Sequence, residues 1–219
     1  GYGLHYDNDK VTQELKSVKL DGDNLVVEGT IKNSSLYDVK ETVQIYFEPP
    51  YSKESKIEKS SKNLVEFDKI EVKKNSSEDF KFSIALEDFA SYDYKGYYNE
   101  NGTYVLESGD YTIYLGKNSH YDWGKQDINI EKTLVYSDSA KIGEAVGKRN
   151  SDVVGAKNLF NDSNLYMDAN TANNYAKNDF CANLSREDFA KTYPTSPSNK
   201  EIPEYVLKTY NARQKDDAM

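Results

Sequence analysis

Between Val11 and Tyr136 the sequence consists of short segments in which apolar and polar residues alternate, separated by turn residues. Alternation with a period of two places one set of side chains on a buried sheet face and the other set on an exposed face. Turn signals recur at roughly the 8–12-residue spacing that is typical of β-sandwiches. The pattern therefore predicts an all-β fold with seven or eight short strands.

The clearest alternations are those of residues 25–31, 42–47 and 80–86. In the first of these, Leu25, Val27, Gly29 and Ile31 share one face. The remaining strands are expected at 11–20, 64–72 (kinked), 103–106, 111–115 and 128–136, with one helical turn at 87–93 and a long polar loop at 51–62. We expect an immunoglobulin-like or fibronectin type III-like β-sandwich over residues 1–136. Because 19 of the residues are Tyr, we also expect Tyr to contribute much of a thin, sheet-like core.

Beyond residue 136 the alternation stops, and Asn, Asp, Ala and Lys become frequent. A stretch of this length with few apolar residues is not expected to form a core of its own. Residues 137–219 are therefore interpreted as an extended, partly helical linker or tail. Short helices are expected after Ser185, which is a good N-cap, and over 201–214, where apolar residues form one stripe.

Charge, cysteine content and hydropathy exclude several classes of protein. The formal net charge is −9, whereas a nucleic-acid-binding surface needs clustered Lys and Arg. Cys181 is the single cysteine, so no intrachain disulfide forms. No apolar run approaches the ~20 residues of a membrane helix. The chain begins with Gly and without signal-peptide features, so we expect an internal piece of a longer protein, whose location, cytoplasmic or cell-surface, this end does not indicate.

Motifs for catalysis, metal binding or cofactor binding are absent from the sequence. The two histidines, His5 and His120, lack the spacing of a zinc site, and the Asp- and Asn-rich clusters lack the Gly and Glu of a calcium loop. These clusters are interpreted as turns, including residues 21–24. No Gly-rich phosphate loop follows a strand, and no carboxylate stands in a distinctive context. We expect no metal, no cofactor and no catalytic residue in this chain.

One group of aromatic residues is a candidate surface for sugar stacking or for docking against another domain. Flat amphipathic rings stack on sugars, but the same rings also dominate the interfaces between domains. We favour packing at a domain interface. The candidate residues are Tyr97, Tyr98, His120, Tyr121 and Trp123.

Several segments, in order, resemble the fibronectin type III-like domain of glycoside hydrolase family 3, the β-glucosidase family. The start, Gly1-Tyr2-Gly3-Leu4-His5-Tyr6, is similar to the family's Gly-Tyr-Gly-Leu-Ser-Tyr. Four further segments resemble family elements: Glu41-Thr42-Val43-Gln44-Ile45-Tyr46 with Pro49-Pro50, Lys62-Asn63-Leu64-Val65-Glu66-Phe67-Asp68-Lys69, Phe89-Ala90-Ser91-Tyr92-Asp93, and Gly109-Asp110-Tyr111 through Gly116. In the tail, Leu184-Ser185-Arg186-Glu187-Asp188 through Tyr193-Pro194 resembles the linker of members with reversed domain order.

The resemblance does not extend to the catalytic residues of the family. In this family the nucleophile lies in a TIM-like barrel and the acid/base carboxylate in or near an α/β sandwich, and neither is matched here. It implies a non-catalytic module that buttresses and positions these two domains of the same parent chain, which would be a β-glucosidase-type hydrolase. Two alternatives remain open: a carbohydrate-binding module that uses the Tyr and Trp residues, and a stand-alone adhesion domain.

Overall fold

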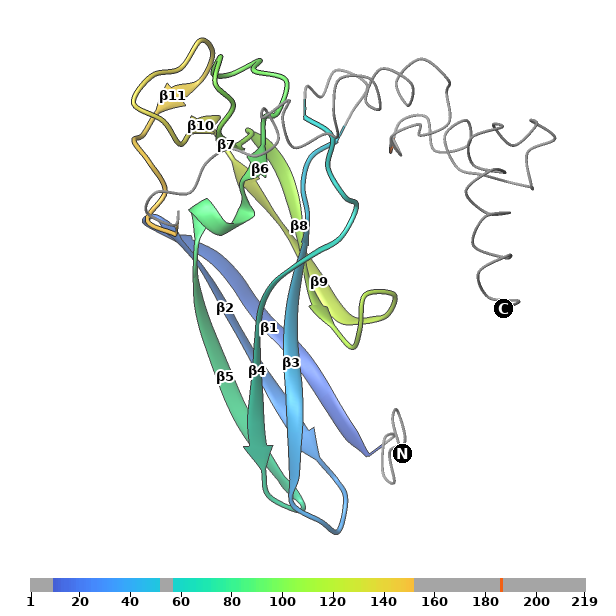
Figure 1. The fold of residues 1–219 in the computed structure, drawn as a ribbon. Helices are drawn as coiled ribbons and strands as arrows, with labels where there is room; N and C mark the ends of the chain where they lie inside the picture. Colours follow the sequence, from blue (N-terminus) through green and yellow to red (C-terminus); the bar gives the residue numbers. More distant parts are fainter. Residues whose placement is uncertain (1–9, 52–56, 152–185, 187–219) are drawn as a thin grey trace, which may run out of the picture. The chain divides into compact units, whose positions relative to one another are not determined.

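The computed structural model describes residues 10–51, 57–151 and 186, and in the first two ranges it has a β-sandwich of two antiparallel sheets (Figure 1). One sheet has the strand order β1-β2-β5 and the other the order β4-β3-β8-β9. The strands of the first sheet are β1 (Val11–Asp21), β2 (Asn24–Asn33) and β5 (Ser76–Ala85). Those of the second are β3 (Val39–Glu48), β4 (Asn63–Val72), β8 (Gly109–Gly116) and β9 (Asp122–Ile130). The predicted fibronectin type III-like sandwich is confirmed.

A third sheet, made of short strands, lies at one end of the sandwich, at the top of Figure 1. Its strand order is β11-β10-β7-β6, from β6 (Ser91–Tyr92), β7 (Tyr104–Leu106), β10 (Leu134–Val135) and β11 (Glu144–Ala145). The predicted helical turn is the 3₁₀ helix η1 (Leu86–Phe89). The predicted strand at 128–136 divides into the end of β9 and β10. β7 pairs with β10 whereas β8 pairs with β3, so these consecutive strands belong to different sheets.

Paired structure extends beyond the expected boundary at residue 136. β11 pairs in parallel with β10, so the chain up to Ser151 returns to the sandwich and contacts it. The apolar content of residues 137–151 did not indicate this return, because the hydrogen bonds that hold these residues are mostly made by the backbone. The expected helices after Ser185 and over 201–214 lie outside the described residues. The chain divides into two compact units, residues 1–180 and 181–219, and all that follows concerns the first.

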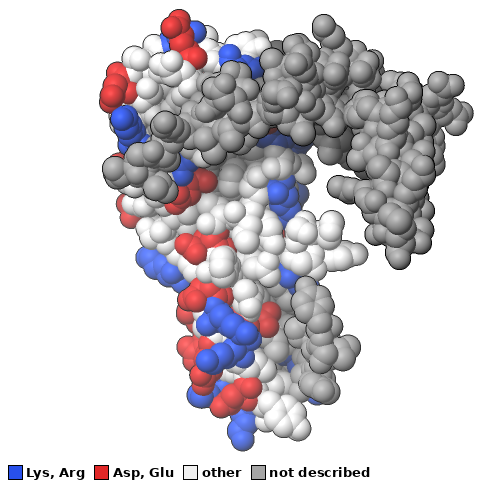
Figure 2. Space-filling model, in the orientation of Figure 1, with Lys and Arg blue, Asp and Glu red and all other residues white. Residues whose placement is uncertain are grey.

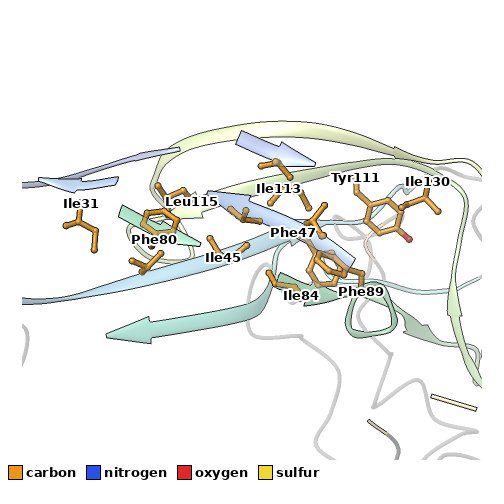
Figure 3. Close-up of a cluster of buried hydrophobic side chains, with 14 of the residues drawn as sticks. Ile31, Ile45, Phe47, Phe80, Ile84, Phe89, Tyr111, Ile113, Leu115 and Ile130 are labelled. Atoms are coloured by element: carbon orange, nitrogen blue, oxygen red, sulfur yellow. The ribbon is translucent and has the colours of Figure 1, made fainter. Parts of the chain in front are cut away.

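The core between the sheets is formed by the alternating inward side chains of both (Figure 3). Leu25, Val27 and Ile31 are 0% exposed, as the alternation predicted. Most of the core is aliphatic or Phe, and Tyr111 is its single fully buried Tyr among the described residues. The expectation of a Tyr-rich core was therefore wrong. Most other tyrosines of the described residues lie outside this core, and the hydroxyls of Tyr46, Tyr98 and Tyr114 reach polar partners.

The turns follow their predicted chemistry. Asp21 and Asn24 flank the β1–β2 turn, where Gly22 has φ of 59°, which favours Gly. The 21–24 cluster is thus a turn, as expected. Asn75, before β5, has φ of 50°, a conformation that Asn tolerates better than most residues.

β4 is kinked, as predicted, because it contains a bulge. Ile45 pairs with Glu66 but Tyr46 pairs with Leu64, so Val65 is the additional residue. The bulge changes which side chains point inward. Leu64 and Phe67 lie toward solvent, with 48% and 62% of their surface exposed.

The described residues include no helix that is long and apolar enough to cross a membrane.

Candidate interaction surface

The predicted aromatic surface falls into two groups at opposite ends of β8. Tyr97 and Tyr98 belong to the loop between β6 and β7, and Tyr98 contacts Glu107, which precedes β8. His120, Tyr121 and Trp123 follow the last residue of β8. At about 3.3 Å per residue the eight residues of β8 separate the groups by roughly 25 Å. The five residues therefore do not form one stacking platform.

Tyr98 is not on the surface. Only 9% of it is exposed, and its hydroxyl donates a hydrogen bond of 2.5 Å to Oε1 of Glu107. Its backbone N–H also donates to the buried carboxylate of Asp93 (2.7 Å). The assignment of Tyr98 to a docking or sugar-binding surface was wrong, because this ring anchors the loop instead. Tyr97, next to it, is 41% exposed.

The hairpin between β8 and β9 carries the second group. Oδ1 of Asn118 accepts the backbone N–H groups of His120 (2.8 Å) and Tyr121 (2.9 Å), which orders the tip. Tyr121 is 70% exposed, whereas the Trp123 ring is half-buried against the core, with Nζ of Lys117 5.3 Å from its centroid. The tip projects as a mostly uncharged surface, while Lys, Asp and Glu crowd the lower part of the sandwich (Figure 2).

The outer face of the four-stranded sheet adds residues that the sequence did not indicate as an interaction surface. Tyr46 lies between Leu64 on β4 and Tyr114 on β8, directly opposite each in the strand register. A Cβ on Gly116 would lie 2.6 Å from the Tyr46 ring, so this glycine lets the ring lie flat against the strand. We call Tyr46, Lys62, Leu64, Phe67 and Tyr114 the lysine–aromatic face.

Lys62 holds this face together. Its Nζ lies 4.3 Å from the centroid of the Tyr114 ring and 5.4 Å from that of Tyr46, both within the range of cation–π attraction. The same atom lies 3.9 Å from Oδ2 of Asp122, which precedes Trp123. The lysine–aromatic face is thereby continuous with the β8–β9 hairpin.

The two tyrosine hydroxyls of this face are fixed by hydrogen bonds. Tyr46 donates to Oε1 of Gln44 (2.7 Å), and Tyr114 donates to Oε2 of Glu48 (2.9 Å). Burial, followed by the hydrogen bond to Glu48, raises the pKa of Tyr114 to about 12. The hydrogen bonds hold both rings in fixed orientations. Rigid rings beside exposed apolar side chains are typical of surfaces that bind other proteins.

Sequence reasoning missed this face because its members come from three strands. Tyr46, Leu64 and Tyr114 become neighbours only through the cross-strand register. One signal was present: Tyr46 and Tyr114 both fall on the polar side of an alternating strand, where an aromatic residue is available for contacts outside the core.

A cavity of about 360 Å³ lies elsewhere, between the β2–β5 end of the sandwich and the chain after β10. Its lining includes Asp23, Leu86, Glu87, Tyr136, Val146 and Lys148. In the described part of the chain, no three His, Cys, Asp or Glu side chains come together as metal ligands would.

The model of the family described as "Fibronectin type III-like domain" matches residues 41–119. A β-glucosidase of Ruminococcus albus is 33% identical over 117 residues, which are 53% of this chain and 12% of that protein. Among solved structures, β-glucosidase 3B of Thermotoga neapolitana in complex with glucose aligns at a TM-score of 0.50 and 27% identity, over 60% of this chain and 17% of that one.

The β-glucosidase of Kluyveromyces marxianus in complex with glucose aligns at a TM-score of 0.52 and 24% identity, over 62% of this chain and 15% of that one, and so shares the fold. The part of the chain that aligns thus corresponds to a small fraction of each much larger relative.

Proposed function

This chain contains the fibronectin type III-like domain of a glycoside hydrolase family 3 enzyme, and from this premise we propose that it is a non-catalytic module that buttresses and positions catalytic domains. The catalytic domains would belong to the same parent chain, an α/β sandwich and a TIM-like barrel that together hydrolyse β-glucosides. The two catalytic carboxylates would then come from different domains. A retaining hydrolase needs about 5 Å between them, so the relative placement of the domains sets the reaction geometry.

The observation that carries the proposal is the lysine–aromatic face. Phe67 and Leu64 are 62% and 48% exposed beside rings that are already fixed by hydrogen bonds. An exposed apolar group next to rigid aromatic rings loses little conformational entropy when another protein surface covers it. This combination favours a permanent contact between domains.

The same geometry argues against sugar stacking on this face. A sugar ring needs an open aromatic face, but Nζ of Lys62 lies over both Tyr46 and Tyr114. Tyr46 is moreover only 8% exposed. A neighbouring domain needs no such access, because it can pack against the lysine stem and the apolar side chains around it.

Carbohydrate binding remains the second candidate because of one observation at the β8–β9 hairpin. Tyr121 is 70% exposed and lies two residues from Trp123, the single Trp of the chain. A ligand at Tyr121 would therefore change the fluorescence of Trp123.

Two measurements on the purified 219-residue chain separate these functions. We expect no hydrolysis of an aryl-β-glucoside above the rate of a mock purification, and measurable turnover would contradict the non-catalytic role. We also expect no change in Trp fluorescence on titration with cello- or xylo-oligosaccharides to millimolar concentration. A saturable change that Tyr121→Ala abolishes would favour the carbohydrate-binding module instead.

A further inference from the structure

The chain between β10 and Ser151 follows a defined path over the end of the sandwich. We call residues 137–151 the strap. The backbone N–H of Glu144 donates to the carbonyl of Thr133 (2.9 Å), that of Val146 to Val135 (3.0 Å) and that of Gly147 to Ser137 (3.2 Å). The strap is therefore attached by its backbone along most of its second half.

The strap is held more by polar contacts than by apolar burial. Ile142 and Val146, two of its larger apolar side chains, are 63% and 42% exposed. Ala140 is the strap residue that packs against the small core cluster beneath it. Since little apolar surface is buried, the attachment at the end of the strap depends on specific hydrogen bonds.

Glu87, on η1, provides two of these bonds. Its Oε2 accepts the backbone N–H of Asn150 (2.9 Å), and its Oε1 accepts that of Ser151 (3.0 Å). Both oxygens of one carboxylate are thus used by two consecutive amides that lie 63 and 64 residues further along the chain. Hydrogen bonds to a charged acceptor are stronger than those between neutral groups.

Arg149 makes a second attachment next to the first. Its guanidinium carbon lies 3.9 Å from the centroid of the Tyr104 ring on β7, and its side chain is only 13% exposed. Nη2 lies 3.9 Å from Oδ1 of Asp88, the neighbour of Glu87, and Nε donates to the Ser151 hydroxyl (3.0 Å). The Tyr104 ring is itself supported edge-on by Tyr92, with centroids 5.2 Å apart.

We infer that Glu87 and Arg149 form a clamp that fixes the position and direction in which the chain leaves the sandwich at Ser151. The clamp joins three consecutive residues, Arg149, Asn150 and Ser151, to two elements of the sandwich, η1 and β7. Residues 152–219 begin at this fixed point. The role of the clamp rests on the proposed function, because a module that positions catalytic domains needs a rigid attachment to the chain that connects them.

The clamp is tested by amide hydrogen exchange on the 219-residue chain. We expect Glu87→Ala to accelerate exchange of the Asn150 and Ser151 amides tenfold or more, because both lose a charged acceptor. Glu87→Gln, which keeps one acceptor oxygen without the charge, should have an intermediate effect. Arg149→Ala should accelerate the same amides, and Arg149→Lys should not restore protection, because Lys cannot stack as a planar group.

A matched control is Glu144→Ala. Glu144 also lies on the strap, but its carboxylate makes an exposed ion pair with Lys132 (3.3 Å), and such pairs contribute little. We expect it to leave exchange at Asn150 and Ser151 unchanged. In all variants the amides of β2 and β5 serve as the measure of global folding. If Glu87→Ala leaves the two amides as protected as in the wild type, the clamp is overturned.

The proposed function is tested separately from the clamp by activity of the full-length parent. Glu87→Ala should lower kcat more than it changes KM, because a changed domain placement would alter the separation of the two catalytic carboxylates. If exchange accelerates in the chain and kcat does not change, the clamp stands and the positioning role is contradicted.

Discussion

Lys59 and Glu107 form an ion pair inside the protein, with only 2% and 10% of their side chains exposed. Nζ of Lys59 also donates to the carbonyl of Pro50 (2.9 Å), and Oε1 of Glu107 accepts the Tyr98 hydroxyl. The Tyr111 hydroxyl donates to the Glu107 carbonyl (2.9 Å). This network ties the chain after β3 to the start of β8, at the end of the sandwich that carries the strap.

Removing one member of this pair should be strongly destabilising. Lys59→Met or Glu107→Leu leaves a buried charge without its partner, which typically costs about 3–5 kcal/mol. The double variant Lys59→Met/Glu107→Leu should lose at least about 1 kcal/mol less than the sum of the two, because neither charge remains. Urea unfolding of the three variants measures this difference. Strict additivity would show that the two groups do not interact.

Alkaline pH should destabilise the fold through its buried tyrosines. Burial, followed by the charge of Glu87, raises the pKa of Tyr136 to about 12, and burial raises that of Tyr98 and Tyr111 as well. A raised pKa in the folded state means that folding favours the protonated phenol. This stabilisation is complete below the unfolded pKa of about 10 and is lost as the pH rises toward 12.

The free energy of unfolding, measured in urea at a series of pH values, should therefore fall between about pH 10 and 12. Tyr136→Phe should make this fall less steep, because the variant has one phenol fewer to ionise on unfolding. A flat profile from pH 9 to 12 would contradict the assignment.

Gly29 should not tolerate a side chain. A Cβ there would lie 2.3 Å from Cζ of Phe80 and 2.4 Å from the backbone oxygen of Glu14, and the backbone cannot give way easily. Gly29→Ala should therefore cost about 3 kcal/mol. Gly124→Ala is the matched control, since its Cβ would make an ordinary 3.4 Å contact with Leu15 and should change stability by about 0.5 kcal/mol or less. Equal midpoints in thermal unfolding for the two variants would contradict the packing described.

Gln126 should protect the free edge of β1 from pairing with other molecules. Its Oε1 accepts the Val18 N–H (3.1 Å) and its Nε2 donates to the Val18 carbonyl (2.8 Å), as a neighbouring strand would. Gln126→Leu exposes both groups, so we expect concentration-dependent association in sedimentation experiments. Asn129→Leu, which removes only a side-chain bond to Asp110, should associate no more than the wild type does. Association of both variants alike would point to surface hydrophobicity rather than to the edge.

The sequence predicted the parts of this fold that depend on local alternation. Leu25, Val27 and Ile31 are buried as their period of two requires. The exposed positions of Leu64 and Phe67 were not predicted, because the bulge at Val65 shifts the alternation within one strand and no residue in β4 signals a bulge. Tyr98 was misplaced because its partner, Glu107, becomes adjacent only in the folded chain.

The candidate sites were less predictable than the strands. The lysine–aromatic face depends on which strands are neighbours, and the clamp depends on a carboxylate and two amides more than 60 residues apart. Such contacts leave no periodic pattern in the sequence. The separation of Tyr97 from Tyr121 could have been predicted, because the strand expected at 111–115, which is part of β8, lies between them.

The most direct test of the docking role compares one double variant in two proteins. Leu64→Ser/Phe67→Ser changes side chains that are 48% and 62% exposed in the 219-residue chain, so its Tm should change little from that of the wild type. In the full-length parent these side chains would be covered by a catalytic domain, and truncation of buried interface anchors typically costs 1 kcal/mol or more each. Leu36→Ser/Tyr37→Ser, at side chains that are 68% and 67% exposed on the β2–β3 turn, is the control.

The measurement is the Tm of the parent by scanning calorimetry. We predict a loss of several degrees for the Leu64/Phe67 variant and none for the control. An unchanged parent Tm in the Leu64/Phe67 variant would contradict docking through the lysine–aromatic face.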